Sequence, residues 1–170
     1  MEFDLDRASE IIQKLRTEPR QWLFGLDEPA DRLLLALFTL IPYTDKLSRT
    51  KRLAPPHVLF VGGTGVGKTD LVNAHAMSVR AKFRRIQGMP NLLPPDVIGY
   101  STIAEDLSGR RIVFCKGPIF GHMILADEMN RMNPKTKSAF LEGMEERSIT
   151  LNVLKDGEYK EEVIPLYPIS

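Results

Sequence analysis

The apolar residues near the start of the chain recur at the spacing of a helix. They stand at Leu5, Ala8, Ile11, Ile12 and Leu15, with charged residues between them. Residues three and four apart share one face of an α-helix, so this spacing predicts an amphipathic helix over Leu5–Leu15. The next patterned segment, Glu28–Ile41, is apolar almost all round, which predicts an internal helix. Trp22, just before it, is expected to fill core.

Further along, short apolar runs alternate with helical patterns. Strands are predicted at His57–Val61, Phe83–Ile86, Arg111–Cys115 and Met123–Ala126, and helices at Thr69–Ala81 and Pro134–Glu146. Strand followed by helix, repeated, predicts an α/β fold built on a parallel sheet.

The remaining segments join these elements. Lys46–Arg52, followed by two prolines, is predicted to be a linker, and Leu92–Tyr100 a proline-marked loop. Ser148–Leu166 is predicted to form a β-hairpin that turns at Asp156 and Gly157. We therefore divide the chain into N-terminal helices with a linker, residues 1–56, and an α/β core with a hairpin, residues 57–170.

Composition narrows the function classes. The chain has 170 residues, 43% of them apolar and 26% charged, which is typical of a globular domain. Its net charge is +1, so no global field favours nucleic acid or an anionic membrane. The longest apolar run, Leu33–Ile41, is far shorter than the roughly 20 residues of a membrane span. A single cysteine and an acidic start without a secretory signal indicate a cytoplasmic setting.

One glycine-rich string stands between the predicted strand at His57–Val61 and the helix after it. It comprises Gly62, Gly63, Thr64, Gly65, Val66, Gly67, Lys68 and Thr69, and fits the phosphate-loop pattern G-x-x-x-x-G-K-[ST]. Glycines let backbone N–H groups turn toward phosphate oxygens, and the helix start adds positive charge. We expect Lys68 to reach the β and γ phosphates of ATP and the Thr69 hydroxyl to bind Mg²⁺. A chance glycine-rich turn is the alternative.

A pair of carboxylates forms the second candidate element. Asp127 and Glu128 directly follow the apolar run Met123–Ala126, at the strand end where open α/β sheets bind ligands. Asp127 is expected to hold Mg²⁺ through water, because this ion keeps most of its hydration. Glu128 is expected to orient, or take a proton from, the water that attacks the γ phosphate. The alternative is that both residues only cap a helix.

Together these strings resemble a known family. Val58–Thr150 resembles the core of AAA+ ATPases and, more narrowly, the MoxR family. The narrower resemblance is carried by Arg85–Gln87, Asn91–Gly99, Gly117–Phe120, Asp127–Arg131 and Pro134–Arg147. Upstream, Leu23–Glu28 resembles the family segment that packs against adenine.

The resemblance implies a function that composition does not. It implies a homo-oligomeric ring, often hexameric, that uses ATP turnover to remodel or mature protein clients, commonly beside a von Willebrand A domain protein. It also places Leu92–Gly99 on the substrate-facing side and Ser148–Leu166 before the sensor strand. Ser170 precedes the family's sensor strand, arginine finger and helical lid, so the sheet is expected to be incomplete.

Two other functions stay open at this point. One is a nucleotide-binding regulatory module without hydrolysis of its own. The other is a nucleic-acid-remodelling ATPase, for which the basic residues Arg80, Lys82, Arg84 and Arg85 are the candidates. We do not favour nucleic acid, because short basic runs are common on exposed helix ends and the chain is nearly neutral. A nucleic-acid partner would give ATPase stimulation with a steep salt dependence.

A few further residues outside these motifs could carry a function. Arg131 is a candidate for contact with a neighbouring subunit's nucleotide, although arginine is more often a surface residue. Asn130 is expected to be a turn or cap residue. The remaining candidates have no metal-like spacing and are expected to be structural; they are His57, His75, His122 and Cys115.

Overall fold

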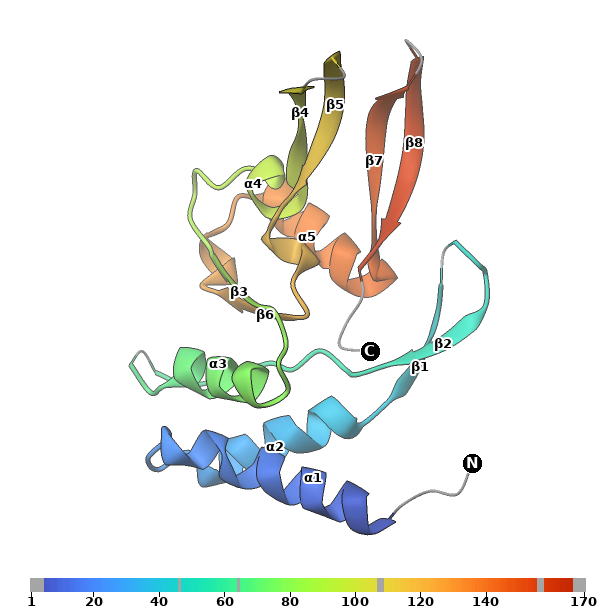
Figure 1. The fold of residues 1–170 in the computed structure, drawn as a ribbon. Coiled ribbons are helices and arrows are strands. Elements are labelled where there is room, and N and C mark those ends of the chain that lie inside the picture. The colour runs from blue at the N-terminus through green and yellow to red at the C-terminus, as the bar shows by residue number, and fades with distance from the viewer. Residues whose placement is uncertain (1–4, 46, 64, 107–108, 156–157, 167–170) are drawn as a thin grey trace. The chain divides into compact units, whose positions relative to one another are not determined.

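A computed structural model describes residues 5–45, 47–63, 65–106, 109–155 and 158–166. The chain divides into two compact units (Figure 1). The first unit combines Met1–Tyr43 with Leu53–Phe83, and the second combines Thr44–Arg52 with Arg84–Ser170. Each unit has its own buried residues, so each is described by itself.

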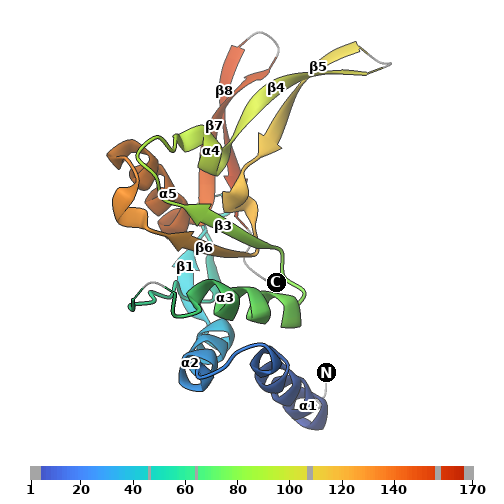
Figure 2. The same cartoon turned by 90° about the vertical axis from the view of Figure 1, so that its left-hand side faces the viewer.

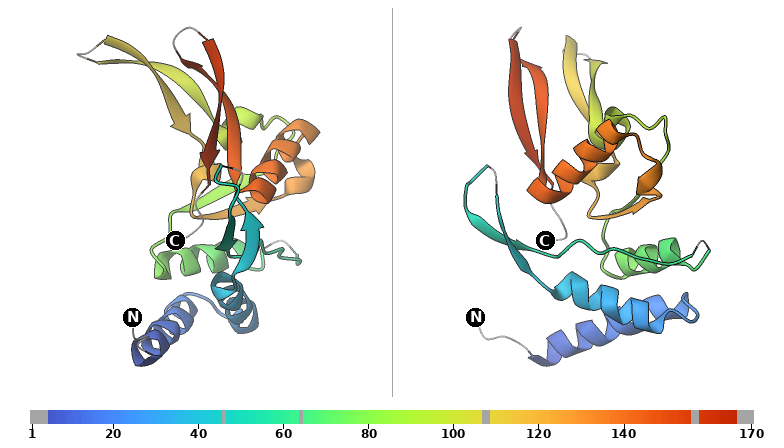
Figure 3. Two further views of the ribbon diagram at one scale, coloured as in Figure 1. Left: turned by 90° about the vertical axis from the view of Figure 1, so that its right-hand side faces the viewer. Right: turned by 180° about the vertical axis from the view of Figure 1, so that it is seen from behind.

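The first unit is helical. It contains α1 (Leu5–Thr17), the 3-10 turn η1 (Pro19–Gln21), α2 (Asp27–Phe38) and α3 (Lys68–Ser78). Figure 3 shows α1 and α2 side by side, and η1 contacts all three helices. The buried apolar residues come from each part; they include Leu15, Leu23, Ala30, Leu33, Leu34, Leu71 and Val72. The predicted helices at Leu5–Leu15 and Thr69–Ala81 are thus confirmed.

The second predicted helix is only partly as expected. α2 ends at Phe38, and Ile41 already begins a strand, so the predicted extent of Glu28–Ile41 was too long. The helix buries Leu33 and Leu34 but leaves Leu35 69% exposed, so it is not internal. Its neighbours within this unit cover one face only. Trp22, expected in the core, is 76% exposed.

The segment before the glycine-rich string was predicted as a buried strand, and this prediction was wrong. Residues 55–63 have no regular secondary structure. Leu59 is 86% exposed and Val61 is 89% exposed. A strand needs a neighbour for its backbone hydrogen bonds. Among the described residues, no strand pairs with this segment.

The predicted linker Lys46–Arg52 is instead part of a hairpin. β1 (Ile41–Thr44) pairs with β2 (Lys51–Ala54). Asp45 closes the turn between them: its carboxylate accepts from the N–H of Leu47 at 2.8 Å and pairs with Arg52 Nε at 2.8 Å. An aspartate that bonds its own turn backbone stabilises such a connection without apolar residues, which explains why the hydrophobic pattern missed it.

The second unit is built around two paired strands. β3 (Phe83–Gln87) pairs with β6 (Met123–Asp127) (Figure 2). The N–H of Gly88, just after β3, donates to the carbonyl of Asp127 at 2.8 Å. Since the C-terminal ends of both strands therefore meet, the pair is parallel. The predictions of these two strands are confirmed.

Short helical pieces and one longer helix enclose this unit's core. They are α4 (Pro94–Ile98), the 3-10 turns η2 (Pro118–Phe120) and η3 (Met129–Arg131), and α5 (Pro134–Glu146). The buried cluster comprises Ile86, Val97, Ile119, Met132, Phe140 and Ile149. α5 begins and ends at the predicted residues. Asn133 caps it by accepting the N–H of Thr136 at 2.9 Å, and Pro134 occupies the first turn.

Two antiparallel hairpins extend from the same end of this unit (Figures 1 and 2). One joins β4 (Gly99–Asp106) to β5 (Gly109–Lys116), with Gly99 opposite Lys116. The other joins β7 (Ser148–Lys155) to β8 (Glu158–Pro165), with Ser148 opposite Pro165. The predicted strand at Arg111–Cys115 and the C-terminal hairpin are confirmed, although the turn residues Asp156 and Gly157 lie outside the described residues.

The prediction of a loop over Leu92–Tyr100 was wrong. This segment contains α4 and the first residues of β4. Gly99 makes the junction possible: its φ is +112°, and a Cβ there would meet the carbonyl oxygen of Cys115. Taken together, the described strands form four separate two-stranded sheets. The predicted α/β class, with an incomplete parallel sheet and a C-terminal hairpin, is confirmed.

Candidate functional site

The glycine-rich string lies in the first unit, at the start of α3. Gly65 has φ +76° and Gly67 has φ +79°, a region that side chains disfavour. These two glycines turn the chain so that α3, an 11-residue helix, begins at Lys68. Thr64 lies outside the described residues. The helix start therefore presents backbone N–H groups and the positive end of its dipole beside the loop, which is the arrangement that binds phosphate.

The Lys68 side chain folds back over this loop. Its Nζ donates to the carbonyl of Gly62 at 3.0 Å and to that of Gly63 at 2.6 Å. The ammonium group is thus held among the backbone groups that would surround a phosphate. Thr69, the next residue, lies half-buried in the first turn of α3.

The segment before α2 reaches the same loop. A Cβ built on Gly67 would lie 2.9 Å from Leu26 Cδ1, so Leu26 packs against the loop at its last glycine. Phe24, two residues earlier, is 91% exposed. The Leu23–Glu28 segment thus contacts the candidate phosphate site within one unit, while its contact with adenine stays a prediction.

The acidic pair lies in the second unit, where β6 ends. Asp127 is the last residue of β6, and Glu128 follows it with φ +50° and ψ +40°. A left-handed conformation costs a residue with a side chain about 1 kcal/mol. It turns the chain sharply into η3, where the N–H of Arg131 donates to the carbonyl of Glu128 at 2.9 Å.

Arginines hold both carboxylates. Arg85 Nη2 on β3 donates to Asp127 Oδ2 at 2.8 Å, and Arg131 Nη1 donates to Glu128 Oε2 at 2.8 Å. The N–H of Glu128 donates to Asp127 Oδ1 at 3.0 Å. The sequence singles out Arg85 as part of a basic cluster and of a segment that resembles the MoxR family, but it does not predict the contact with Asp127. The available signal was its position one residue before the end of a strand predicted to lie in the same sheet.

The carboxylate oxygens of Asp127 are suitable ligands for magnesium. Among the described residues, no group of three or more His, Cys, Asp or Glu is placed to hold a metal ion. Magnesium needs no such group, because it retains several waters and uses one or two protein oxygens with the substrate's phosphates. Asp127 supplies a carboxylate whose two oxygens each retain an acceptor site beyond the bond described above. The candidate ligands Thr69 and Asp127 belong to different units.

Three of the other single candidates have the following burial and contacts. His75 is 2% exposed and its Nδ1 bonds the carbonyl of Leu71 at 2.8 Å. Cys115 is a half-buried free thiol on β5. Arg131 is engaged with Glu128 of its own chain.

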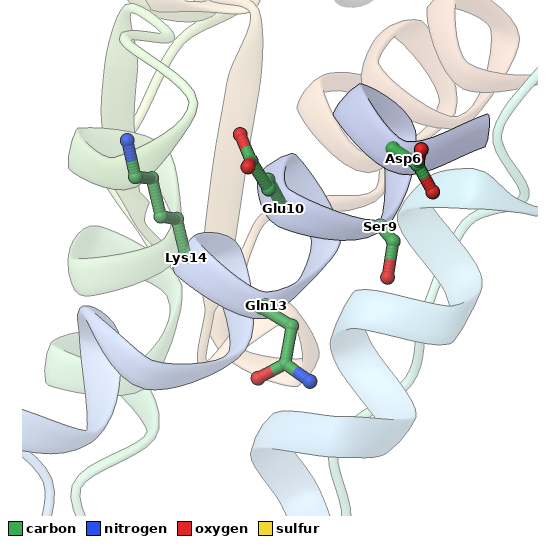
Figure 4. A pocket seen from close by; sticks show the side chains of 5 residues that line it. All are labelled: Asp6, Ser9, Glu10, Gln13 and Lys14. Carbon is green, nitrogen blue, oxygen red and sulfur yellow. The ribbon is translucent and has the colours of Figure 1, made fainter. Parts of the chain in front are cut away.

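A shallow hollow lies along α1 and has no part in the site. Figure 4 shows its lining, which is Asp6, Ser9, Glu10, Gln13 and Lys14. All five side chains come from one helix, and none belongs to either candidate motif. A hollow with a single wall cannot enclose a ligand, because most binding sites bury the greater part of their ligand.

Comparison with known proteins identifies the family. Residues 57–160, more than half of the chain, match the model of the ATPase family associated with various cellular activities (AAA). The chain belongs to this family. The matched region contains both candidate motifs and the two strands that lead to Arg85 and Asp127.

Individual relatives support the narrower resemblance to MoxR proteins. The chain is 34% identical to Chaperone MoxR1 of Mycobacterium tuberculosis over 147 residues, which cover 85% of this chain and 34% of the relative. It is 34% identical to Protein MoxR of Paracoccus denitrificans over 112 residues, 63% of this chain and 32% of the relative. It is 48% identical to the Bacillus subtilis protein YeaC over 106 residues, 62% of this chain and 32% of the relative. The chain is thus a MoxR-type AAA+ ATPase by family.

A solved structure agrees with this assignment. A crystal structure of a candidate ATPase from Cytophaga hutchinsonii matches with a TM-score of 0.64 and 30% identity, covering 96% of this chain and 44% of that one. The chain spans about a third of the length of the curated relatives described above. None of the helices formed by the described residues is long and apolar enough to cross a membrane.

Proposed function

We propose that this chain binds Mg-ATP and takes part in its hydrolysis to drive the remodelling or maturation of protein clients. The observation that carries the proposal is the loop at the start of α3. Two glycines with positive φ, a helix N-terminus and the Lys68 ammonium occur together there, in a region that matches an ATPase family. This combination is suited to a polyphosphate, because each part contributes positive potential or N–H donors.

Each motif residue has a role in the proposal. The backbone N–H groups of Gly62–Thr69 bind the β phosphate, and Lys68 moves from its loop carbonyls to the β and γ phosphates. The Thr69 hydroxyl and, through water, Asp127 hold Mg²⁺, which neutralises charge that develops on the phosphates. Glu128 orients the attacking water and accepts its proton. For this, Glu128 must release Arg131, with which it is paired.

The wider activity also belongs to the proposal. The relative from Mycobacterium tuberculosis is named a chaperone, which supports protein clients rather than nucleic acid. We also propose a homo-oligomeric ring, a von Willebrand A domain partner and a cytoplasmic location. The first two are supported by the family resemblance, and the location by the single cysteine and the acidic start of the chain.

The test measures ATP binding by calorimetry and phosphate release by this 170-residue chain. Lys68→Ala removes a charged donor and is expected to weaken ATP binding about tenfold to a hundredfold. Glu128→Gln is expected to retain ATP binding and to lower kcat at least a hundredfold. Lys14→Ala on α1 and Glu142→Gln on α5 are matched exposed controls, expected to behave as the parent chain.

The outcomes separate two functions. Turnover that both motif variants abolish supports an ATPase. Binding without turnover, lost only in Lys68→Ala, supports a nucleotide-binding regulatory module, the second candidate. The Glu128–Arg131 ion pair favours the regulatory module if the pair remains when ATP is bound. A carboxylate that is held by an arginine is not available to a water. No ATP binding by the parent chain contradicts both.

A further inference from the structure

Arg85 holds the carboxylate of Asp127 from the neighbouring strand. Its Nη2 donates to Asp127 Oδ2 at 2.8 Å and also to Gln87 Oε1 at 2.7 Å. The second carboxylate oxygen, Oδ1, accepts the N–H of Glu128 at 3.0 Å. Both oxygens of Asp127 thus have a donor: one donor lies on β3, and the other belongs to the residue that directly follows β6. Rotation of this carboxylate is therefore restricted at both of its oxygens.

We propose that Arg85 is a positioning residue for the magnesium site, which keeps Asp127 in the orientation that receives the hydrated ion. This inference rests on the proposed function and adds to it a residue that neither motif contains. Gln87 is part of the arrangement, because its Oε1 accepts from the same guanidinium nitrogen that donates to Asp127. Partners of this kind orient metal-binding carboxylates in many proteins, and their loss lowers metal affinity about 10- to 100-fold.

The positive charge of Arg85 opposes magnesium binding, but this effect is weaker than the gain from orienting Asp127. A guanidinium would repel Mg²⁺, yet the charge of Arg85 is already paired with the carboxylate of Asp127. The Arg85 side chain is also 46% exposed, so water screens the repulsion. Two of the roughly four acceptor positions of Asp127 are used by Arg85 and Glu128, which leaves positions for the waters of the ion.

A purely structural role for Arg85 makes a different prediction. If the ion pair only tied β3 to β6, its loss would lower the unfolding temperature. Loss of the ion pair would then change the ATP affinity by the same factor with and without magnesium. A positioning role changes the magnesium-dependent part alone.

The experiment measures ATP affinity of the 170-residue chain by calorimetry, once with excess Mg²⁺ and once in EDTA. The ratio of the two affinities is the magnesium factor. In Arg85→Ala we expect this factor to fall about tenfold, while affinity in EDTA stays within about twofold of the parent. Arg85→Lys should recover part of the factor, since lysine keeps the charge but not the planar fork. Arg84→Ala, the adjacent exposed arginine on β3, is the matched control and should match the parent.

Each result decides between the inference and the proposed function. If the parent binds ATP through Lys68 and Arg85→Ala leaves the magnesium factor unchanged or raises it, the inference is overturned and the proposed function stands. Equal losses with and without Mg²⁺, together with a lower unfolding temperature, assign Arg85 a structural role. If the parent does not bind ATP, both proposals fail. Should Arg85→Ala not fold, Arg85→Gln gives the same comparison.

Discussion

Four described residues other than glycine have a left-handed backbone, and they mark where the chain must turn sharply. They are Arg49, Arg80, Glu128 and Arg147. Arg80 and Arg147 follow helices, a position that commonly requires this conformation. Glu128 follows a strand and carries a candidate catalytic carboxylate. Strain of this kind gathers at functional sites, where the surrounding structure holds the residue in place.

The end of α3 offers a direct test of this strain. The N–H of Ala81 donates to the carbonyl of Ala76 at 2.7 Å and that of Arg80 to Met77 at 3.0 Å, the hydrogen-bond pattern of a Schellman motif. Arg80→Gly should stabilise the chain by about 0.5–1 kcal/mol, because glycine adopts positive φ without strain and loses only part of that gain through its freer unfolded state. Denaturant unfolding checks this. Arg80→Ala keeps the strain, so equal stability of the two variants would contradict the explanation.

Asp31 gives a prediction on pH. Hydrogen bonds from Arg16 lower the pKa of Asp31 most; partial burial opposes this, and the charges of Arg16 and Arg20 add to it. Folded Asp31 therefore keeps its charge to a lower pH than unfolded Asp31. Its stabilising effect is fully present above the unfolded pKa, about 4, and disappears as the pH falls through the lower folded value.

The measurement is thermal unfolding of the chain and of Asp31→Asn between pH 7 and pH 3. At pH 7 the variant should melt at the lower temperature, and the difference should shrink below about pH 4. Glu142→Gln, exposed on α5, controls for general acid effects. A difference that does not change with pH would show that the ion pairs of Asp31 contribute nothing to stability.

At the scale of elements, the sequence predicted those whose signals are local. α5 begins at Pro134 after the capping residue Asn133, and both signals can be read without knowledge of the fold. β6 was predicted from its short apolar run, Met123–Ala126. The hairpin at Ser148–Leu166 followed from two β segments and an Asp-Gly turn. In each case neighbouring residues decide the structure.

Elements that depend on distant partners were not predictable in this way. The apolar run His57–Val61 indicates a need for burial, but a strand also needs a neighbour to pair with. β4 pairs with β5 along its whole length, yet its sequence mixes Thr, Ser, Ala and acidic residues and carries no clear alternation. The contacts of Arg85 with Asp127 and of Arg131 with Glu128 likewise depend on strand order and on the turn at Glu128. The candidate motifs could therefore be predicted, but not the arginines that hold them.

Two glycines test how tightly the elements of the second unit pack. A Cβ on Gly117 would meet backbone atoms of Val97, Ile98 and Gly99. One on Gly143 would meet side-chain ends instead: those of Ile119 and Ile149, each at 2.8 Å, and that of Leu166 at 3.5 Å. Gly117→Ala should therefore destabilise the chain by more than about 2 kcal/mol. Gly143→Ala should stay within about 1 kcal/mol of the parent, because flexible side chains yield and alanine favours the helix. Denaturant unfolding of both variants compares one added methyl group at two sites; equal effects would contradict this account.

At the scale of the whole molecule, the candidate residues divide between the two units. Gly62–Thr69 lie in the first unit, and Asp127 and Glu128 lie in the second. Each group is organised within its own unit: Lys68 by the loop carbonyls, and the acidic pair by Arg85 and Arg131. The family assignment leads us to propose that one ATP site uses both groups. In that case ATP alone should affect the first unit, and only ATP with Mg²⁺ should also affect the second.

Hydrogen exchange can separate these effects. ATP in EDTA should slow exchange at residues 65–69, because the phosphates occupy those N–H groups, and should leave residues 127–131 unchanged. ATP with Mg²⁺ should slow both segments, because the ion links the phosphates to Asp127. Lys68→Ala should lose both effects, and Glu128→Gln should keep both, since it retains the metal-binding residues. Protection of 65–69 alone under Mg-ATP would mean that Asp127 does not take part in the site, and that the acidic pair serves its own unit only.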